Sequence, residues 1–376
     1  MNKTTNLIRL GDAATFINGF AFKPTQWGES GIPIIRIQNL NNPVAPFNYF
    51  DGDVPNKYLV KKGDILISWS ASLGAYEWTG ENAYLNQHIF KVVFDKADID
   101  KHFLKYAVTS KLSEMDKDAH GATMRHIVKK DFDNTKIPFP PLTEQQHIVE
   151  ELDLLSSIIE KKKAQLFELD NLAQSLFYEM FGDPITNEKG WEVKKLGKLC
   201  ITSSGGTPSK THKEYYEGGN IPWLRSGEVA QGYIYNTEMY ITEEGLNNSS
   251  AKYFPINTVV VAMYGATVGQ VGILKSRMTT NQAICGIFPS ESFVPTFLMF
   301  FLKGMKPVYL KDAAGGAQPN ISQGVIKDTL VPIVSIALQQ QFVERIEAVE
   351  HQKELIKKSI KEVETLFNSR MDYYFN

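Results

Sequence analysis

Two stretches of this 376-residue chain begin alike: PLTEQQHIVEELDLLSSI at 141–158 and SIALQQQFVERIEAVEHQ at 335–352. Each places a glutamine pair ahead of a segment with periodic apolar residues. Residues 142–181 and 337–376, which run from these stretches to an aromatic end, contain no proline or glycine. Neither segment therefore has a residue that would break a helix. The sequence therefore predicts the same long helix twice, at 142–181 and at 337–376.

The apolar residues of both helices follow a heptad pattern, with steps of four and three. The seam consists of Ile148, Leu152, Leu155, Ile159, Leu166, Leu169, Ala173, Leu176 and Met180 in the first helix, and of Phe342, Ile346, Val349, Ile356, Ile360, Val363 and Phe367 in the second. Lys162 and Lys353 interrupt this seam. An apolar stripe must be buried, and the other copy is the obvious partner. We expect an antiparallel coiled coil related by a pseudo-two-fold axis; two separate amphipathic core helices are the alternative.

The repeat extends through the rest of the chain. Six landmarks recur in unchanged order: Leu-Gly at 10 and 196, Ile-Pro at 32 and 221, Asn-Gln at 86 and 281, Gly-Ala at 121 and 316, Gln-Gln at 145 and 339, and Phe at 181 and 375. The chain is thus a tandem duplication.

Each repeat mixes strand and helix signals. Apolar runs at 63–69, 89–94, 257–265 and 283–288 predict buried strands, and the segments 102–115 and 296–309 predict helices. The expected fold class is α+β, with two pseudo-symmetric mixed α/β domains separated by two long helices that form an antiparallel coiled coil. The expected boundaries are 1–141 for the first domain, 142–181 for the central helix, 182–336 for the second domain and 337–376 for the C-terminal helix.

Composition excludes several classes of protein. The net charge of −2 lacks the basic excess of a stand-alone DNA-binding domain. The two cysteines, Cys200 and Cys285, are far apart and form no CxxC motif, which argues against zinc and against a disulfide framework. The N-terminus lacks a signal peptide, and no apolar run approaches the roughly 20 residues that span a bilayer. We expect a cytoplasmic protein.

No catalytic motif is found in the sequence. Phosphate-binding GxxxxGK[ST], dinucleotide-binding GxGxxG, HExxH and GxSxG patterns are all missing, as is the Asn/Asp-Pro-Pro-aromatic signature of an amino-methyltransferase. The seven histidines are dispersed. The sequence therefore predicts a binding protein with no catalytic residues and no metal site.

Four segments carry a specific resemblance. They are IPFPPLTEQQHIVEELDLL at 137–155, LFYEMFGDPITNEKGWEVKKLG at 176–197, SSGGTPSK at 203–210 and IPWLRSGEV at 221–229. With these segments in this order, and duplicated, essentially the whole chain resembles the specificity subunit of Type I restriction-modification systems. The sequence departs from the family pattern at its second Pro-Pro motif, which reads VPIVSIALQQQ.

The resemblance implies a non-catalytic subunit with two target-recognition domains, bound to double-stranded DNA, to two DNA methyltransferase subunits and, for cleavage, to restriction subunits. S-adenosylmethionine, and ATP with Mg²⁺, would belong to those partners. Each domain would read one half of an asymmetric bipartite site, and the coiled coil would set the gap between the halves. Two alternatives stay open: a related restriction system with a nuclease fused to the methyltransferase, and an enzyme or scaffold outside DNA modification.

Candidate DNA-binding residues are polar, basic or aromatic side chains in or beside the paired loops, because base edges and phosphates are read by such groups. They are Lys23, Arg36, Trp69, Tyr76, Thr123 and Arg125 in the first domain, and Thr207, Ser209, Lys210, Arg225, Tyr264, Gln318 and Asn320 in the second. A core position is an equal alternative for Trp69 and Tyr264, which adjoin apolar strands. We expect Asn86 and Gln282 to satisfy buried backbone groups.

Overall fold

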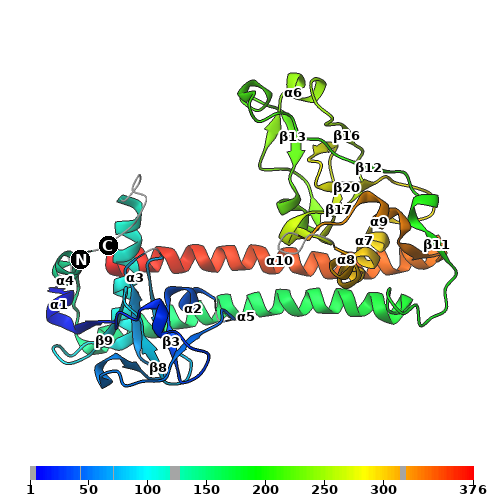
Figure 1. Ribbon diagram of the computed structural model, residues 1–376. Coiled ribbons are helices and arrows are strands. Elements are labelled where there is room, and N and C mark those ends of the chain that lie inside the picture. Colours follow the sequence, from blue (N-terminus) through cyan, green and yellow to red (C-terminus); the bar gives the residue numbers. More distant parts are fainter. Residues whose placement is uncertain (1–5, 43, 71, 119–127, 314–318) are drawn as a thin grey trace. The chain divides into compact units, whose positions relative to one another are not determined.

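The computed structural model describes residues 6–42, 44–70, 72–118, 128–313 and 319–376. The chain forms two compact units, Met1–Lys163 with Lys358–Asn376, and Ala164–Lys357. Both long helices, α5 (Leu142–Phe181) and α10 (Ile336–Phe375), pass from one unit to the other, so each unit contains half of each helix (Figure 1).

The first unit contains three small sheets. Its strands are β1 (Leu7–Arg9), β2 (Thr15–Asn18), β3 (Ile32–Ile35), β4 (Asn48–Phe50), β5 (Leu59–Val60), β6 (Ile65–Ser68), β7 (Gly74–Glu77), β8 (Ala83–Leu85), β9 (Ile89–Val93) and β10 (Lys136–Pro138). They pair in the orders β1-β10, β2-β9-β6-β7 and β4-β3-β8-β5. Because β8 and β9 belong to different sheets, the short turn between them joins the two larger sheets.

The helices of the first unit are α1 (Leu10–Ala13), α2 (Ile37–Asn41), α3 (Lys101–Asp118) and α4 (Lys129–Asn134), with the 3₁₀ turns η1 (Pro24–Gln26) and η2 (Asn56–Tyr58). The apolar face of α3 packs on the sheet of β2, β9, β6 and β7, where Phe103 and Leu104 are buried. The end of α10 joins the same core through Met371 and Phe375. Since the ring of Phe375 meets that of Phe103 on α3, with centres 5.3 Å apart, this domain and the helix end form one hydrophobic core.

The second unit has β11 (Val193–Lys195), β12 (Thr202–Ser204), β13 (Ile221–Leu224), β14 (Tyr233–Ile234), β15 (Tyr240–Ile241), β16 (Tyr253–Phe254), β17 (Val259–Ala262), β18 (Val271–Leu274), β19 (Met278–Thr280), β20 (Ile284–Ile287) and β21 (Leu330–Pro332). The sheet orders are β11-β21, β12-β20-β17-β18-β14 and β15-β13-β19-β16. Its helices are α6 (Glu243–Asn247), α7 (Pro295–Gly304), α8 (Lys306–Asp312) and α9 (Gln323–Asp328), with 3₁₀ turns η3 (Leu196–Lys198), η4 (Lys213–Tyr215), η5 (Ser226–Gln231) and η6 (Gly265–Thr267).

Strand pairing confirms the duplication. The parallel pair β3–β8 corresponds to the parallel pair β13–β19, and the antiparallel pairs β2–β9 and β6–β9 correspond to β12–β20 and β17–β20. The short strand β14 is an addition of the second unit, where it pairs in parallel with β18. Both units therefore share one topology, and the second carries an extra edge strand.

The long helices pair antiparallel within each unit, as the sequence predicts. In the first unit, Arg370 Nη2 donates to Glu151 Oε2 at 2.8 Å, and Lys163 Nζ lies 3.5 Å from Glu364 Oε1. In the second unit, the rings of Phe181 and Phe342 are 5.4 Å apart. Residue numbers thus rise along α5 while they fall along α10.

Most residues of the predicted seam are buried or half-buried. Ile148, Leu152, Leu155, Ile159, Phe342, Ile346, Val349 and Ile360 are buried, and Leu166, Leu169, Ile356, Val363 and Phe367 are half-buried. The end of α5 differs from the prediction. Beyond Ala173 the buried positions are Phe177 and Phe181, whereas Leu176 and Met180 are only partly buried. The spacing of the buried positions changes because this part of α5 packs against the aromatic residues of α7. The ring centres of Phe177 and Phe297 are 5.7 Å apart.

The predicted strands and helices of the domains are present, with one correction. The segment 296–309 is two helices, α7 and α8, separated at Met305. Pro307 lies in the first turn of α8, where the backbone N–H groups have no partner within the helix, so the missing N–H of proline costs nothing. In the middle of a continuous helix the same proline would remove a hydrogen bond and break the helix. No described helix is long and apolar enough to span a membrane.

The first glutamine of each repeated pair fixes the start of a long helix. Gln145 is fully buried; its Oε1 accepts the N–H of Asp100 at 2.8 Å, just before α3. Gln339 is also fully buried, and its Oε1 accepts the N–H of Val294 at 2.7 Å, just before α7. The amides thereby satisfy buried backbone groups. The repeated glutamines tie each long helix to the helix of its own domain.

Lys353, which interrupts the predicted seam, forms an ion-paired bridge between the helices. Its Nζ lies 2.7 Å from Asp170 Oδ1 on α5 and 2.8 Å from Glu350 Oε1 on α10. The side chain of Lys353 is only 14% exposed, and that of Glu350 is 22% exposed. A polar residue in such a seam helps to specify register.

We expect Lys353→Met to lower the free energy of unfolding by about 1 kcal/mol, because it keeps the apolar stem but leaves Glu350 half-buried without its cation. Urea unfolding measures this. Lys357→Met is the matched control, since Lys357 forms the same i,i+3 pair with Glu354 at an exposed position and should change stability by less than about 0.5 kcal/mol. A Lys353→Met protein as stable as the unsubstituted chain would show that the bridge contributes nothing.

Candidate nucleic-acid interface

Four strands of the first unit end at one place. The residues that follow β2, β3, β6 and β8 form the first strand-end cluster, which comprises residues 19–23, 36, 69 and 86–88. Backbone hydrogen bonds hold it together: Phe20 N to Leu85 O at 2.8 Å, Gln87 N to Phe20 O at 2.9 Å, Asn86 N to Ile35 O at 3.1 Å and Trp69 N to His88 O at 3.4 Å. The cluster lies at the turn that joins the two larger sheets.

The second unit repeats this arrangement after β12, β13, β17 and β19. Its second strand-end cluster comprises residues 205–210, 225, 263–264 and 281–283. The corresponding hydrogen bonds are Gly206 N to Thr280 O at 2.9 Å, Gly205 N to Ile284 O at 3.2 Å, Asn281 N to Leu224 O at 2.9 Å and Met263 N to Ala283 O at 2.8 Å. The repeated Asn-Gln pairs and the residues that follow the repeated Ile-Pro strands therefore meet in both units.

Two glycines allow the close approach of backbone segments in these clusters. A Cβ on Gly19 would lie 2.0 Å from the carbonyl oxygen of Asn86, and a Cβ on Gly205 would lie 2.1 Å from Oγ1 of Thr280. Such contacts are too short for any side chain, so both positions require glycine. The same physical requirement explains a glycine at this point in each repeat.

Three of the predicted residues of the first domain lie in the first strand-end cluster. Lys23 is exposed at the start of η1. The Nη1 of Arg36 donates to Asn48 Oδ1 at 3.1 Å, and its guanidinium lies 4.6 Å from the centre of the Trp27 ring. Trp69 is half-buried and donates from Nε1 to Asn18 Oδ1 at 3.3 Å. The ring of Trp69 also packs against Phe90 in the core, so the core alternative is partly right, while contact with DNA stays a prediction.

Tyr76 lies elsewhere in the first unit. It pairs with Leu66 at the start of β6, whereas Trp69 follows the end of that strand. The hydroxyl of Tyr76 donates to Asn41 Oδ1 at 2.6 Å, and burial raises the pKa of Tyr76. The backbone of Tyr76 is thus outside the first strand-end cluster, while its hydroxyl reaches Asn41 at the end of α2.

In the second unit, Thr207 donates from Oγ1 to Oε1 of Gln282, while Ser209 and Lys210 are exposed. Tyr264 is 43% exposed and forms an isolated antiparallel bridge with Asn320. These residues are linked through the cluster, because Met263 bonds to the turn that carries Gln282. The second strand-end cluster thus brings together Thr207 and Tyr264, and Tyr264 links it to Asn320.

Arg225 is the most strongly held of the predicted residues. Its Nε donates to Glu228 Oε1 at 3.3 Å, and its Nη2 donates to Glu238 Oε2. Two carboxylates therefore neutralise the charge of this candidate DNA-binding residue. Thr123, Arg125 and Gln318 lie outside the residues that the structure describes.

The repeated Asn-Gln pairs do not act as predicted. Gln282 bonds to the side chain of Thr207 rather than to a buried backbone group, and the side-chain oxygens Oδ1 of Asn86 and Asn281 are buried with no hydrogen-bond partner among the described residues. Sequence reasoning also missed Asn48 and Glu238, which touch the two arginines. Both lie on segments that only the folded chain brings near β3 and β13.

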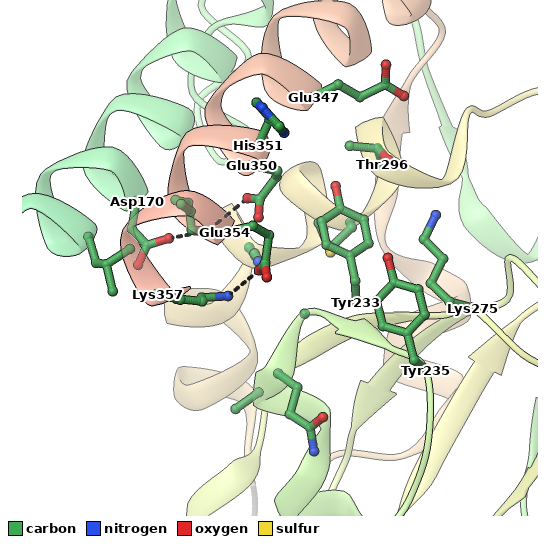
Figure 2. Close-up of a pocket in the computed structure, with 17 residues that line it drawn as sticks. Asp170, Tyr233, Tyr235, Lys275, Thr296, Glu347, Glu350, His351, Glu354 and Lys357 are labelled. Atoms are coloured by element: carbon green, nitrogen blue, oxygen red, sulfur yellow. Dashed lines mark hydrogen bonds and ion pairs between the residues drawn. The ribbon is translucent and has the colours of Figure 1, made fainter. Parts of the chain in front are cut away.

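A separate cavity of about 940 Å³ lies in the second unit between α10, α7 and β14 (Figure 2). Tyr233 and Tyr235 project into it from the β14 segment, and the α10 wall carries Glu347, Glu350 and Glu354. Burial lowers the pKa of Lys303, which also lines the cavity. None of the predicted DNA-binding residues lines this cavity, so it is distinct from the second strand-end cluster.

In the first unit, side-chain contacts of His102 link the edge strand of the larger sheet to the long helix. His102 on α3 lies between two carboxylates, with Nδ1 3.1 Å from Asp153 Oδ2 on α5 and Nε2 3.1 Å from Glu77 Oε2 on β7. The edge strand β7 is thereby tied to α5 through α3. In the second unit the edge strand is instead the added β14.

The described residues contain no cluster of three or more His, Cys, Asp or Glu side chains that could hold a metal ion. Cys200 and Cys285 are buried free thiols, and burial raises the pKa of both, that of Cys285 to about 12. A thiol with a raised pKa is a poor nucleophile at neutral pH. The chemistry offered by the described residues is hydrogen bonding, stacking and charge.

Comparisons with known proteins agree with this arrangement. The family described as Type I restriction modification DNA specificity domain matches residues 2–169 and again residues 188–365. The EcoBI specificity subunit of Escherichia coli is 24% identical, covering 94% of this chain and 81% of the relative. The MjaVIII specificity subunit of Methanocaldococcus jannaschii is also 24% identical, covering 95% and 89%.

Solved structures share the fold. The S subunit of a Type I restriction-modification system from M. genitalium aligns over 100% of this chain and 98% of its own, with a TM-score of 0.53 and 15% identity. A chain from a structure of type I R-M complex assembly aligns over 98% and 96%, with a TM-score of 0.58 and 17% identity. With two matches that together span nearly the whole sequence, one in each repeat, the chain belongs to the Type I restriction modification DNA specificity domain family.

Proposed function

We propose that this chain is the DNA sequence-specificity subunit of a Type I restriction-modification complex, and that each domain reads one half of an asymmetric bipartite site. The observation that carries this proposal is the duplicated strand-end cluster. Both units place it on the same scaffold, yet the side chains differ, with Trp69 in the first and Tyr264 in the second. Two related readers with different side chains recognise two unlike half-sites.

The domains 1–141 and 182–336 are the proposed readers, and the paired helices α5 and α10 are the proposed spacer. A rigid connection between two readers fixes the spacing of their half-sites, as it does in dimeric DNA-binding proteins. The antiparallel contacts within each unit support this role, because they fix the register of the two helices there.

The proposed partners are two DNA methyltransferase subunits and, in the full complex, restriction subunits. The names of the relatives support partnership in a restriction enzyme. Because the sequence carries no motif for S-adenosylmethionine or for ATP, we assign these cofactors, and Mg²⁺, to the partner subunits. The surfaces of α5 and α10 that face away from the seam are the proposed docking sites for the methyltransferases.

Salt dependence tests direct contact with DNA. Binding of the chain, assembled with its methyltransferase, should weaken as salt rises, because each neutralised phosphate releases about 0.9 counterion. Lys23→Ala and Lys210→Ala should each reduce the slope of log K against log[salt] by about 1, with the same loss for all DNA sequences. Lys62→Ala is the control, since this exposed lysine precedes β6 and lies outside both clusters and outside the long helices. Unchanged slopes in both variants would exclude these lysines from phosphate contact.

A further inference from the structure

Arg36 and Arg225 occupy equivalent positions in the two units. Each directly follows the strand that pairs in parallel with β8 or β19, and each begins a short helical turn. The backbone N–H of Arg36 donates to Asn39 Oδ1 at 3.0 Å, and that of Arg225 donates to Glu228 Oε1 at 3.2 Å. Asn39 and Glu228 are both buried. The backbone therefore presents both arginines in the same way.

The side chains around these arginines differ in charge. Among the described residues, the side chain of Arg36 contacts two neutral groups, the amide of Asn48 and the ring of Trp27. Arg225 contacts two carboxylates, Glu228 and Glu238. One positive charge against two negative charges leaves the Arg225 group with a net charge of −1, while the Arg36 group keeps a net charge of +1.

This difference decides what the Arg225 group can bind. A group with a net charge of −1 repels phosphate, so it is unsuited to a backbone contact with DNA. Base edges offer a better match, because they carry hydrogen-bond donors as well as acceptors. Of these donors, the amino group of cytosine suits a carboxylate.

The geometry of the Arg225 fork supports the same conclusion. Glu228 and Glu238 occupy the edge formed by Nε and Nη2. No residue that the structure describes bonds to Nη1, so the edge formed by Nη1 and the second hydrogen of Nη2 is open to a ligand. Two parallel donors match O6 and N7 of guanine. The carboxylate of Glu238 is 70% exposed and can accept a further hydrogen bond beside this fork.

We propose that Arg225 and Glu238 together read one G·C base pair in the half-site of the second unit, with Arg225 on guanine and Glu238 on the amino group of cytosine. Glu228 is the positioning residue: it is buried, holds Arg225 through Nε and the backbone N–H, and accepts the N–H of Glu238 at 2.8 Å. This inference rests on the proposed reading of DNA. The different partners of Arg36 and Arg225 would give the two units different half-sites, although both units have the same backbone arrangement.

The test uses the full chain assembled with its methyltransferase and a set of duplexes in which every base pair of the target is changed in turn. The unsubstituted complex should show two specified halves, and failure at this stage would contradict the proposed function itself. Arg225→Ala and Glu238→Ala should then lose discrimination at the same single G·C pair of the second half-site. The expected loss is between about 5-fold and 150-fold in relative affinity, the range for one bidentate contact.

Two further variants make the result decisive. Arg225→Lys keeps the charge but removes the fork, so base reading predicts a loss of discrimination, whereas phosphate contact predicts none. Glu244→Ala removes an exposed carboxylate of the same unit that does not touch Arg225, and it should change nothing. The inference is overturned if Arg225→Lys and Glu238→Ala leave all positions unchanged, if they relax different base pairs, or if they weaken all duplexes equally. Thermal melting confirms that each variant is folded.

Discussion

Replacing residues 182–336 with the corresponding segment of a relative is expected to change one half of the DNA target and to leave the other half unchanged. The reason is that the second strand-end cluster is built entirely from this segment, while the first is built from residues 19–88. Affinity for the original site should fall by about 10³-fold or more, which is the usual ratio of specific to non-specific binding. Sequencing of methylated sites in cells that carry the hybrid complex measures the new target.

The hybrid must keep the contacts between the exchanged domain and the long helices. Phe297 on α7 packs against Phe177 and Phe181 of α5, with ring centres 5.7 and 4.8 Å apart. The donor segment should therefore have large apolar residues at the positions of Phe297 and Phe300. Exchange of residues 1–141 is the matched control and should change the other half only. A hybrid that alters both halves would contradict independent reading.

Lengthening the paired helices should widen the unread gap without altering either half-site. The insertion is four residues in each helix, between Lys163 and Ala164 in α5 and between Lys357 and Lys358 in α10, where the helices pass from one unit to the other. Four helical residues add about 6 Å, which corresponds to about two base pairs at 3.4 Å each. Coiled coils accommodate such four-residue insertions by local unwinding.

The effect on the original target should be large, because both halves can no longer be contacted together. Binding to a set of duplexes with gaps of different length measures the shift of the optimum. Insertion into α5 alone is the control, since it breaks the register of Lys353 with Asp170 and should lower stability instead. An unchanged optimal gap in the double insertion would show that these helices do not set the spacing.

Local sequence patterns predicted the parts of the fold whose physical cause is local. The heptad steps from Ile148 to Ile159 lie in one unbroken helix and are buried as expected. The step from Ala173 to Phe177 was not predictable in this way, because it depends on the aromatic residues of α7, more than a hundred residues away. The two-residue strand β14 is likewise too short to have a pattern and is defined only by its pairing with β18.

The sequence predicted which loops carry the candidate site, but it did not predict the partners of the side chains in those loops. The repeated Asn-Gln pairs at 86 and 281 lie in the turns where backbone segments approach closely, and the candidate residues Arg36 and Arg225 lie beside those turns. The state of Arg225 depends on Glu238, thirteen residues away in another loop. Sequence alone therefore suggested a candidate DNA-binding residue, while the folded chain shows an arginine held between two carboxylates.

Mapping of methylated bases across the genome of a cell that carries the complete complex tests the central claim most directly. Two readers on one spacer predict a single target made of two unlike specified parts, separated by a constant number of bases that are not specified. A continuous target without such a gap, or a target whose gap varies freely from site to site, would contradict the account.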